Sequence, residues 1–162
     1  MKNMCMVLLA LLSIQLPGCA LKGGMGSAKN KEQVQRIRSS GTVLPKFQMY
    51  EEITITREKV VLMRRGKSVP SSIPAGQWEI VLDEKTANAF FTDLESLDYS
   101  HITRIEPDIP PLGGGTKVYD ISLRTGEKIH MFFEAGTTYT NSQCIVDRIN
   151  TFINSLPLPH FF

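Results

Sequence analysis

Residues 116–134 read TKVYDISLRTGEKIHMFFE, and this stretch decides the fold class. Apolar and polar side chains alternate on both sides of Thr125-Gly126, which is the mark of two half-buried strands joined by a tight turn. The stretch therefore predicts an antiparallel hairpin over residues 116–124 and 127–134. Its inward apolar residues are Tyr119, Ile121 and Leu123 on one strand and Ile129, Met131 and Phe133 on the other.

The same alternation predicts further strands upstream of this hairpin. They are residues 46–56, residues 60–65 after a turn at Arg57-Glu58, and a segment containing Trp78, Ile80 and Leu82. Another strand is expected over residues 100–106. Glu51 is the one polar residue on the inner side of the first of these strands.

Two amphipathic helices are predicted from apolar residues at helical spacing. The first follows Asp83, a suitable N-cap residue, and its apolar residues are Ala87, Phe90, Phe91, Leu94 and Leu97. The second opens with Thr140 and Gln143, spaced as a capping box, and its apolar residues are Ile145, Ile149, Phe152, Ile153 and Leu156. Runs of strands with two one-sided helices predict an α+β fold, in which two helices cover one face of an antiparallel sheet of about five to six strands.

Residues 1–18 are predicted to be a cleaved export signal. After Lys2, residues 4–16 form an apolar stretch, which is shorter than the roughly 20 residues that a membrane-spanning helix needs. The stretch leads into Leu16-Pro17-Gly18-Cys19, and these four residues resemble the lipobox of bacterial lipoproteins. Pro17 departs from the small residue that is usual at its place.

The resemblance implies that Cys19 is the lipid-attachment residue and the first residue of the mature chain. Its thiol would receive a diacylglycerol and its amino group a further acyl chain such as palmitate, and two or more chains give stable membrane anchoring. This implies a location in the bacterial cell envelope. With Ala20 after the cysteine, a host with two membranes would carry the protein on its outer membrane, facing the periplasm. Cleavage after Ala20 as an ordinary secretory signal is the alternative.

Residues 19–41 are predicted to form a flexible basic tether and residues 42–162 a single α+β domain. The tether has five basic residues and one acidic residue, a net charge of +4, whereas the domain has 12 basic and 15 acidic residues, a net charge of −3. The tether could be drawn to anionic lipid headgroups or act as a solvated spacer. An acidic domain does not favour nucleic acid as a partner.

Of the three cysteines, Cys144 alone remains in the domain. We expect a buried structural cysteine, because free cysteine is among the most buried residue types. A nucleophile paired with His101 or His130 is the alternative. His130 lies on the outward side of its strand and is expected to face solvent.

Neither a metal site nor an acid/base pair is favoured by the remaining residues. The histidines His101, His130 and His160 lack the spacing of a metal site. The strand carboxylates Glu51, Asp120 and Glu134 could meet as an acid/base pair, although ordinary polar-face residues are the more favoured interpretation. We therefore expect no catalytic residue, no metal and no cofactor.

The leading hypothesis is a lipid-anchored, non-enzymatic protein whose domain binds or inhibits a protein partner in the envelope. The loops at residues 66–76 and 107–115 are the predicted recognition elements. The order of elements over residues 50–156 resembles small bacterial protease inhibitors of the emfourin type, which implies a loop inserted into a protease cleft. No diagnostic motif assigns the domain to a family.

Two alternatives remain open. One is a structural component of an envelope complex, with the outward residues Tyr50, Val61, Val81 and Phe132 as an interface. The other is a hydrolase of envelope material that uses Cys144 or a carboxylate pair.

Overall fold

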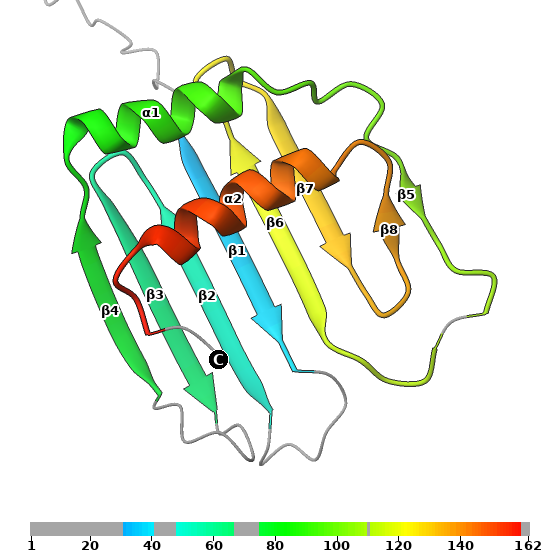
Figure 1. Ribbon diagram of the computed structural model, residues 1–162. Helices are drawn as coiled ribbons and strands as arrows, with labels where there is room; N and C mark the ends of the chain where they lie inside the picture. The colour runs from blue at the N-terminus through cyan, green and yellow to red at the C-terminus, as the bar shows by residue number, and fades with distance from the viewer. Residues whose placement is uncertain (1–30, 41–47, 67–74, 110, 160–162) are drawn as a thin grey trace, which may run out of the picture.

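The computed structural model describes residues 31–40, 48–66, 75–109 and 111–159 (Figure 1). Its strands are β1 (Gln33–Ser39), β2 (Met49–Ile55), β3 (Lys59–Gly66), β4 (Gly76–Val81), β5 (Arg104–Ile105), β6 (Thr116–Ser122), β7 (Lys128–Phe133) and β8 (Thr138–Tyr139), and its helices are α1 (Glu84–Glu95) and α2 (Gln143–Ser155). The main sheet has the strand order β4-β3-β2-β1-β6-β7, and β5 pairs with β8 in a small separate ribbon. Figure 1 shows both helices crossing the same face of the main sheet.

The predicted fold class is confirmed, because an antiparallel sheet of six strands with two helices on one face is an α+β fold. The predicted hairpin is present as β6 and β7, with Tyr119 opposite Met131 and Ile121 opposite Ile129. Its turn contains Gly126 at a φ of 92°, a conformation that glycine adopts without steric strain. The inward alternation in the sequence therefore sets both the buried face and the register of this hairpin.

The core lies between the sheet and the two helices. The side chains of Phe91 and Leu94 on α1, and of Ile149 on α2, have no measurable exposure. The rings of Phe90 and Phe152 stack with centroids 4.0 Å apart, which joins the two helices directly. The apolar face of each helix thus covers the apolar face of the sheet, as the helical spacing predicts.

The predicted tether over residues 19–41 is wrong in its last part. Residues 33–39 form β1, which pairs with β2 on one side and with β6 on the other and is therefore an interior strand of the main sheet. The predicted domain boundary at residue 42 falls after this strand. The domain begins before Gln33, and residues 19–30 lie outside the described residues.

The sequence of β1 lacks the alternation of apolar and polar residues that predicts a strand, because arginines occupy inward positions. Val34 is fully buried, but Arg36 and Arg38 take the next two inward positions, where apolar residues are expected. Glu32 before the strand is also buried, and Arg57 holds its carboxylate through two guanidinium nitrogens. This hydrogen-bonded ion pair lowers the pKa of Glu32 and fixes the start of β1 beside the β2–β3 turn.

The two predicted helix starts have different outcomes. Asp83 is the N-cap of α1 as predicted, and its Oδ1 accepts a hydrogen bond from the backbone N–H of Thr86 at 2.9 Å. The predicted capping box at Thr140 is wrong, because α2 begins after Ser142. The Thr140 hydroxyl donates instead to the carbonyl of His101, which ties the start of α2 to the segment before β5. Of the strand expected over residues 100–106, only β5 is present.

We predict that Val34→Asp destabilises the domain by about 3–5 kcal/mol, because it places an unpaired charge in the interior of the sheet. Val81→Asp is the matched control. Val81 is also a strand valine but is 79% exposed, so its replacement should change the free energy of unfolding by no more than about 0.5 kcal/mol. Urea unfolding followed by circular dichroism measures the free energy of unfolding of both variants. Equal stability of the two variants would contradict the assignment of residues 33–39 to the core.

Candidate functional site

The predicted lipid-attachment residue, Cys19, lies outside the described residues. Its role therefore stays a prediction from the sequence. Neither helix in the described part of the chain is both long and apolar enough to cross a bilayer.

The prediction that Cys144 is buried is wrong, because its side chain is exposed in the first turn of α2. The buried positions of this helix are Ile145, Ile149 and Ile153, and a residue one position before that line is rotated away from the core by about 100°. Cys144 lines a surface cavity of about 570 Å³. None of the described residues that line this cavity is a histidine. Neither His101 nor His130, the predicted partners of Cys144, is therefore among the described residues of this cavity.

The structure does not bring the three candidate carboxylates together. Glu51 is buried on the helix-covered side of the sheet. Asp120 lies on the opposite side, where its Oδ1 is 2.5 Å from Nδ1 of His130, whose exposed side chain confirms its predicted outward position. Glu134 lies after β7 and forms an ion pair with Arg104 at 2.8 Å. Each carboxylate has its own basic neighbour, so these three residues do not form an acid/base pair with one another, in line with the favoured interpretation.

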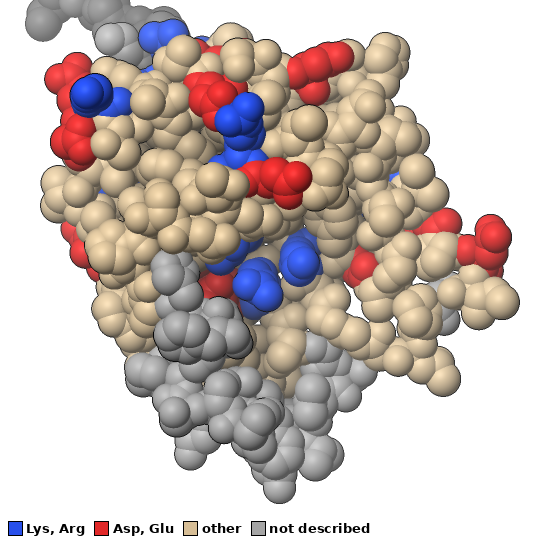
Figure 2. All heavy atoms as spheres, in the orientation of Figure 1, with Lys and Arg blue, Asp and Glu red and all other residues tan. Residues whose placement is uncertain are grey.

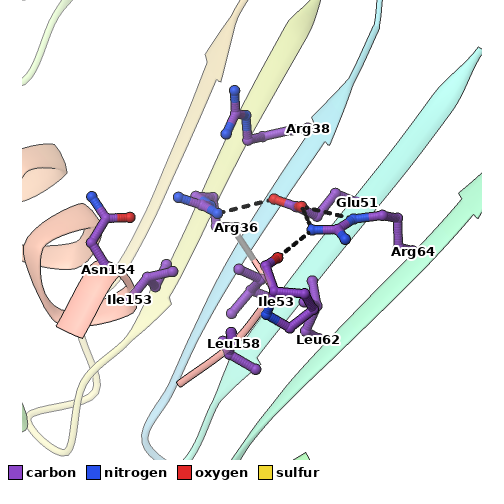
Figure 3. Close-up of a pocket in the computed structure, with 10 residues that line it drawn as sticks. Arg36, Arg38, Glu51, Ile53, Leu62, Arg64, Ile153, Asn154 and Leu158 are labelled. Atoms are coloured by element: carbon purple, nitrogen blue, oxygen red, sulfur yellow. Dashed lines mark hydrogen bonds and ion pairs between the residues drawn. The ribbon is translucent and has the colours of Figure 1, made fainter. Parts of the chain in front are cut away.

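The most unusual group of side chains in the described core is a buried ion cluster across three adjacent strands (Figure 3). Glu51 on β2 lies between Arg36 on β1 and Arg64 on β3, with N–O distances of 3.0 and 2.8 Å. The exposed fractions of the three side chains are 7% for Arg36, 3% for Glu51 and 1% for Arg64. Arg36 also donates to Oδ1 of Asn150 on α2, and Arg64 donates to the carbonyl of Pro159, each at 2.8 Å.

Two buried arginines share the one buried carboxylate of Glu51 among the described residues of this cluster. Buried charge is stable only when it is paired and hydrogen-bonded. Burial lowers the pKa of Arg36, whereas the neighbouring carboxylate of Glu51 raises it. The Nε atom of Arg36 is buried and has no hydrogen-bond partner in the described structure.

Two small cavities adjoin the cluster beside the second half of α2. One has a volume of about 60 Å³ and includes Glu51 and Arg64 in its lining, and the other has a volume of about 220 Å³ and includes Lys117. Arg36 and Arg38 line both cavities. Figure 2 shows the corresponding feature on the surface, a hollow beneath the helices with several basic side chains and little acidic surface around it.

The sequence contains a pattern that indicates this cluster. Glu51 is a polar residue on the inner side of its predicted strand. Arg64 and Lys117 occupy inward positions of β3 and β6 in the same way. Charged residues of opposite sign at inward positions of neighbouring strands indicate a buried ion pair. The sequence analysis does not include Arg36 in this pattern, because it places residues 19–41 in the tether.

The second candidate site is the recognition loop, which we define as residues 107–109 and 111–115 between β5 and β6. Ile109 is 85% exposed and Leu112 is fully exposed, which is unusual for large aliphatic side chains. This confirms that the loop lies at the surface, as predicted. Of the other predicted loop, residues 66–76, only residues 66, 75 and 76 are described.

The base of the recognition loop is held by polar contacts and by close packing. Arg104 forms ion pairs with Glu106 and Glu134 at 2.5 and 2.8 Å. Thr137 donates to Glu106 at 3.3 Å. A Cβ atom at Gly136 would lie only 3.0 Å from the ring of Pro107, so the loop approaches this turn closely. The loop is therefore braced at its base while its apolar side chains point into solvent.

The predicted interface on the uncovered face of the sheet is not a continuous apolar surface. The cross-strand neighbours of Tyr50 are Ser39 and Arg65. Those of Val61 are Thr54 and Glu79, and Val81 lies opposite Lys59. Phe132 differs because it lies opposite Val118. Polar neighbours thus separate three of the four predicted interface residues.

Comparison of this chain with protein-family models, with curated proteins and with solved structures finds no match. No residue role is therefore taken from a relative.

We predict that Glu51→Gln lowers the free energy of unfolding by about 3–5 kcal/mol, because it leaves two buried arginines without their shared carboxylate. Glu79→Gln is the control, since Glu79 pairs with Lys59 at the surface of the sheet and such pairs contribute about 0–1 kcal/mol. Chemical unfolding at neutral pH measures both variants. A loss below 1 kcal/mol in Glu51→Gln would mean that the cluster does not stabilise the fold.

Proposed function

We propose that this chain is a lipid-anchored protein of the bacterial cell envelope whose domain binds a protein partner through the recognition loop. The observation that carries the binding role is the pair Ile109 and Leu112, two large aliphatic side chains exposed on a braced loop. No enzymatic activity is part of the proposal.

The pair has the properties of an interface anchor. Aliphatic side chains gain free energy when they leave water, at roughly 25 cal/mol for each Å² of apolar surface buried. A loop that is already held in place also loses less conformational entropy on binding than a free one. The contacts of Arg104, Glu106 and Thr137 at the loop base supply that restraint. These features favour a partner with an apolar cleft, which a protease cleft of the kind implied by the emfourin resemblance would provide.

The lipid anchor rests on Leu16-Pro17-Gly18-Cys19. Only residues 20–30 separate Cys19 from the first described residue. A fully extended chain covers at most about 3.6 Å per residue, so the domain would start within about 40 Å of the bilayer surface. Partners close to the same membrane are therefore the ones that the recognition loop would reach.

The hydrolase alternative receives no support from the described side chains. Cys144 is accessible, but the described residues around its cavity include no histidine that could activate it. The structural-component alternative is also less favoured, since polar residues interrupt the proposed interface on the sheet.

We predict that the double variant Ile109→Asp, Leu112→Asp loses its protein partner without losing stability. Both side chains are exposed, so their replacement should change the free energy of unfolding by no more than about 0.5 kcal/mol for each residue. Crosslinking in intact cells, followed by mass spectrometry of the captured proteins, compares the variant with the parent chain. Val81→Asp is the control, since it charges an exposed apolar residue on β4 and should retain the partner. Identical captured proteins in the double variant and the parent would refute the role of the loop.

The lipid anchor has a separate test. Intact-mass analysis of the membrane-extracted protein should give a chain that begins at Cys19 and carries two or three acyl chains. Cys19→Ser should remove the acyl chains and move the protein out of the membrane fraction, whereas Cys144→Ser should leave both unchanged. A soluble product that begins at Leu21 would show ordinary secretion in place of lipidation.

A further inference from the structure

We propose that β4 is a dimerisation strand, which pairs antiparallel with β4 of a second copy of this chain and joins the two sheets. β4 and β7 are the two outer strands of the main sheet. The outer side of an edge strand presents backbone N–H and C=O groups that can pair with another chain. In Figure 1, β4 and the β5–β8 ribbon lie at opposite sides of the sheet. This surface is therefore separate from the recognition loop and does not depend on the proposed function.

The hydrogen bonds of the β3–β4 pair show which backbone groups of β4 face outward. The N–H of Leu82, just after β4, donates to the carbonyl of Glu58 at 2.9 Å, so the hydrogen-bonded positions of this pair are the even-numbered residues of β4. In an antiparallel pair these positions alternate with positions whose N–H and C=O point away from the neighbouring strand. The groups that point away belong to Gln77, Glu79 and Val81. Among the described residues, no second strand lies beside β4 to receive them.

The opposite edge of the sheet is blocked by a side chain. The hydroxyl of Tyr139 accepts a hydrogen bond from the N–H of Phe132 on β7 at 2.9 Å and donates one to its carbonyl at 3.2 Å. The guanidinium of Arg104 lies over the Phe132 ring, 5.5 Å from its centroid. Tyr139 thus takes the place that a further strand would have beside β7.

β4 lacks the features that usually protect an exposed edge. Such edges carry lysine or proline, or a bulge that interrupts the pairing. The sequence of β4, GQWEIV, has neither residue, and its pairing with β3 is continuous from Gly76 to Val81. Its one charged residue, Glu79, forms an ion pair with Lys59 at 2.9 Å. The edge is therefore regular, and its charge is paired within the same chain.

The sequence of this edge is complementary to itself, which favours a second copy as the occupant. A two-fold axis through Trp78 places Gln77 opposite Glu79 of the partner subunit, and the symmetry repeats this contact. The amide of Gln77 can donate a hydrogen bond to that carboxylate, whereas an alignment of Glu79 with itself would oppose like charges. The alignment through Trp78 also places Ala75 opposite Val81 of the partner subunit, which extends the pairing over residues 75–81.

Trp78 lies at the centre of this alignment, on the helix-covered face. Its indole packs along its own strand, since a Cβ atom at Gly76 would lie only 3.0 Å from the ring. The guanidinium of Arg64 lies 5.5 Å from the ring centroid and holds it from the other strand. The indole is only partly buried at this edge. Pairing would bring two indoles opposite each other, and aromatic cross-strand pairs stabilise a sheet.

The size of the contact sets the expected affinity. Only one strand of each copy takes part, so the interface is smaller than the roughly 800 Å² per partner of a standard one. We therefore expect a weak dimer, with a Kd of about 10–100 µM in solution. The two-fold axis is perpendicular to the sheet, so the helices of both copies would lie on the same face of the joined sheet.

Sedimentation velocity of the purified full chain, at concentrations up to about 1 mM, tests for this dimer. Glu79→Pro should weaken it by at least about tenfold, because proline removes an outward N–H group and its ring blocks the edge. Lys128→Pro is the matched control on the opposite edge, where the N–H of this exposed residue points away from β6 in the same way. It should dimerise as the parent does. Circular dichroism checks that both variants fold.

Thiol crosslinking locates the contact without relying on the proline variants. Cys144→Ser first removes the exposed thiol of the described domain. In that chain, Gln77→Cys should give a crosslinked dimer with a short bismaleimide, whereas Lys128→Cys should not. This comparison decides the location of the contact even where Glu79→Pro fails to fold.

Three results would overturn the dimer: a parent chain that is monomeric up to about 1 mM, a folded Glu79→Pro variant that dimerises as Lys128→Pro does, or crosslinking through residue 128 in place of residue 77. A monomeric parent chain would leave the β4 edge to a strand of another protein. The double variant Ile109→Asp, Leu112→Asp should dimerise as the parent does. Loss of the protein partner and loss of the dimer are thereby distinguishable.

Discussion

The shared carboxylate of Glu51 is the constraint around which the sheet is organised. It joins β1, β2 and β3 through Arg36 and Arg64, at N–O distances of 3.0 and 2.8 Å in a region closed to solvent. A slip of one residue in the register of β2 would turn Glu51 to the uncovered face and remove the carboxylate that Arg36 and Arg64 share in the core. The cluster therefore penalises such a slip, and it does so at the middle of a six-stranded sheet.

The same cluster connects the sheet to α2 and to the segment that follows this helix. Arg36 reaches Asn150 on α2, and Arg64 reaches the backbone carbonyl of Pro159 just after that helix. The helix is thus positioned by two oriented hydrogen bonds as well as by its apolar face. The cavities with basic linings occur at this junction because β1, α2 and the chain after α2 meet there around charged side chains that cannot pack as closely as aliphatic ones.

The recognition loop lies on a different part of the framework. Figure 1 shows the β5–β8 ribbon beside the β7 edge of the main sheet, with the loop leading from β5 into β6. The Arg104 ion pairs and the packing of Pro107 against Gly136 hold the loop base. The binding role that we propose for this loop would fit such a scaffold, because the scaffold supplies stability that the loop itself does not need.

Agreement between sequence and structure follows the strength of the local pattern. The β6–β7 hairpin and α1 have unbroken alternation or helical spacing and a suitable turn or cap residue, and both are present as predicted. Residues 33–39 lack the alternation of a half-buried strand because Arg36 and Arg38 occupy inward positions, so the sequence does not predict β1. The predictions for Cys144 and Thr140 were also wrong. Cys144 is exposed because it lies one residue before the buried positions of α2, and the Thr140 hydroxyl bonds to His101, which is distant in the sequence.

The sequence by itself determined the α+β class, the apolar faces and the hairpin register, since these follow from periodicities that neighbouring residues create. It also supplied Leu16-Pro17-Gly18-Cys19, on which the predicted anchor rests. Only the tertiary structure decided that residues 33–39 complete the middle of the sheet and that Arg36 meets Glu51 and Asn150. Those partners lie 15 and 114 residues away along the chain, and the energy of a buried charge depends on what surrounds it in space.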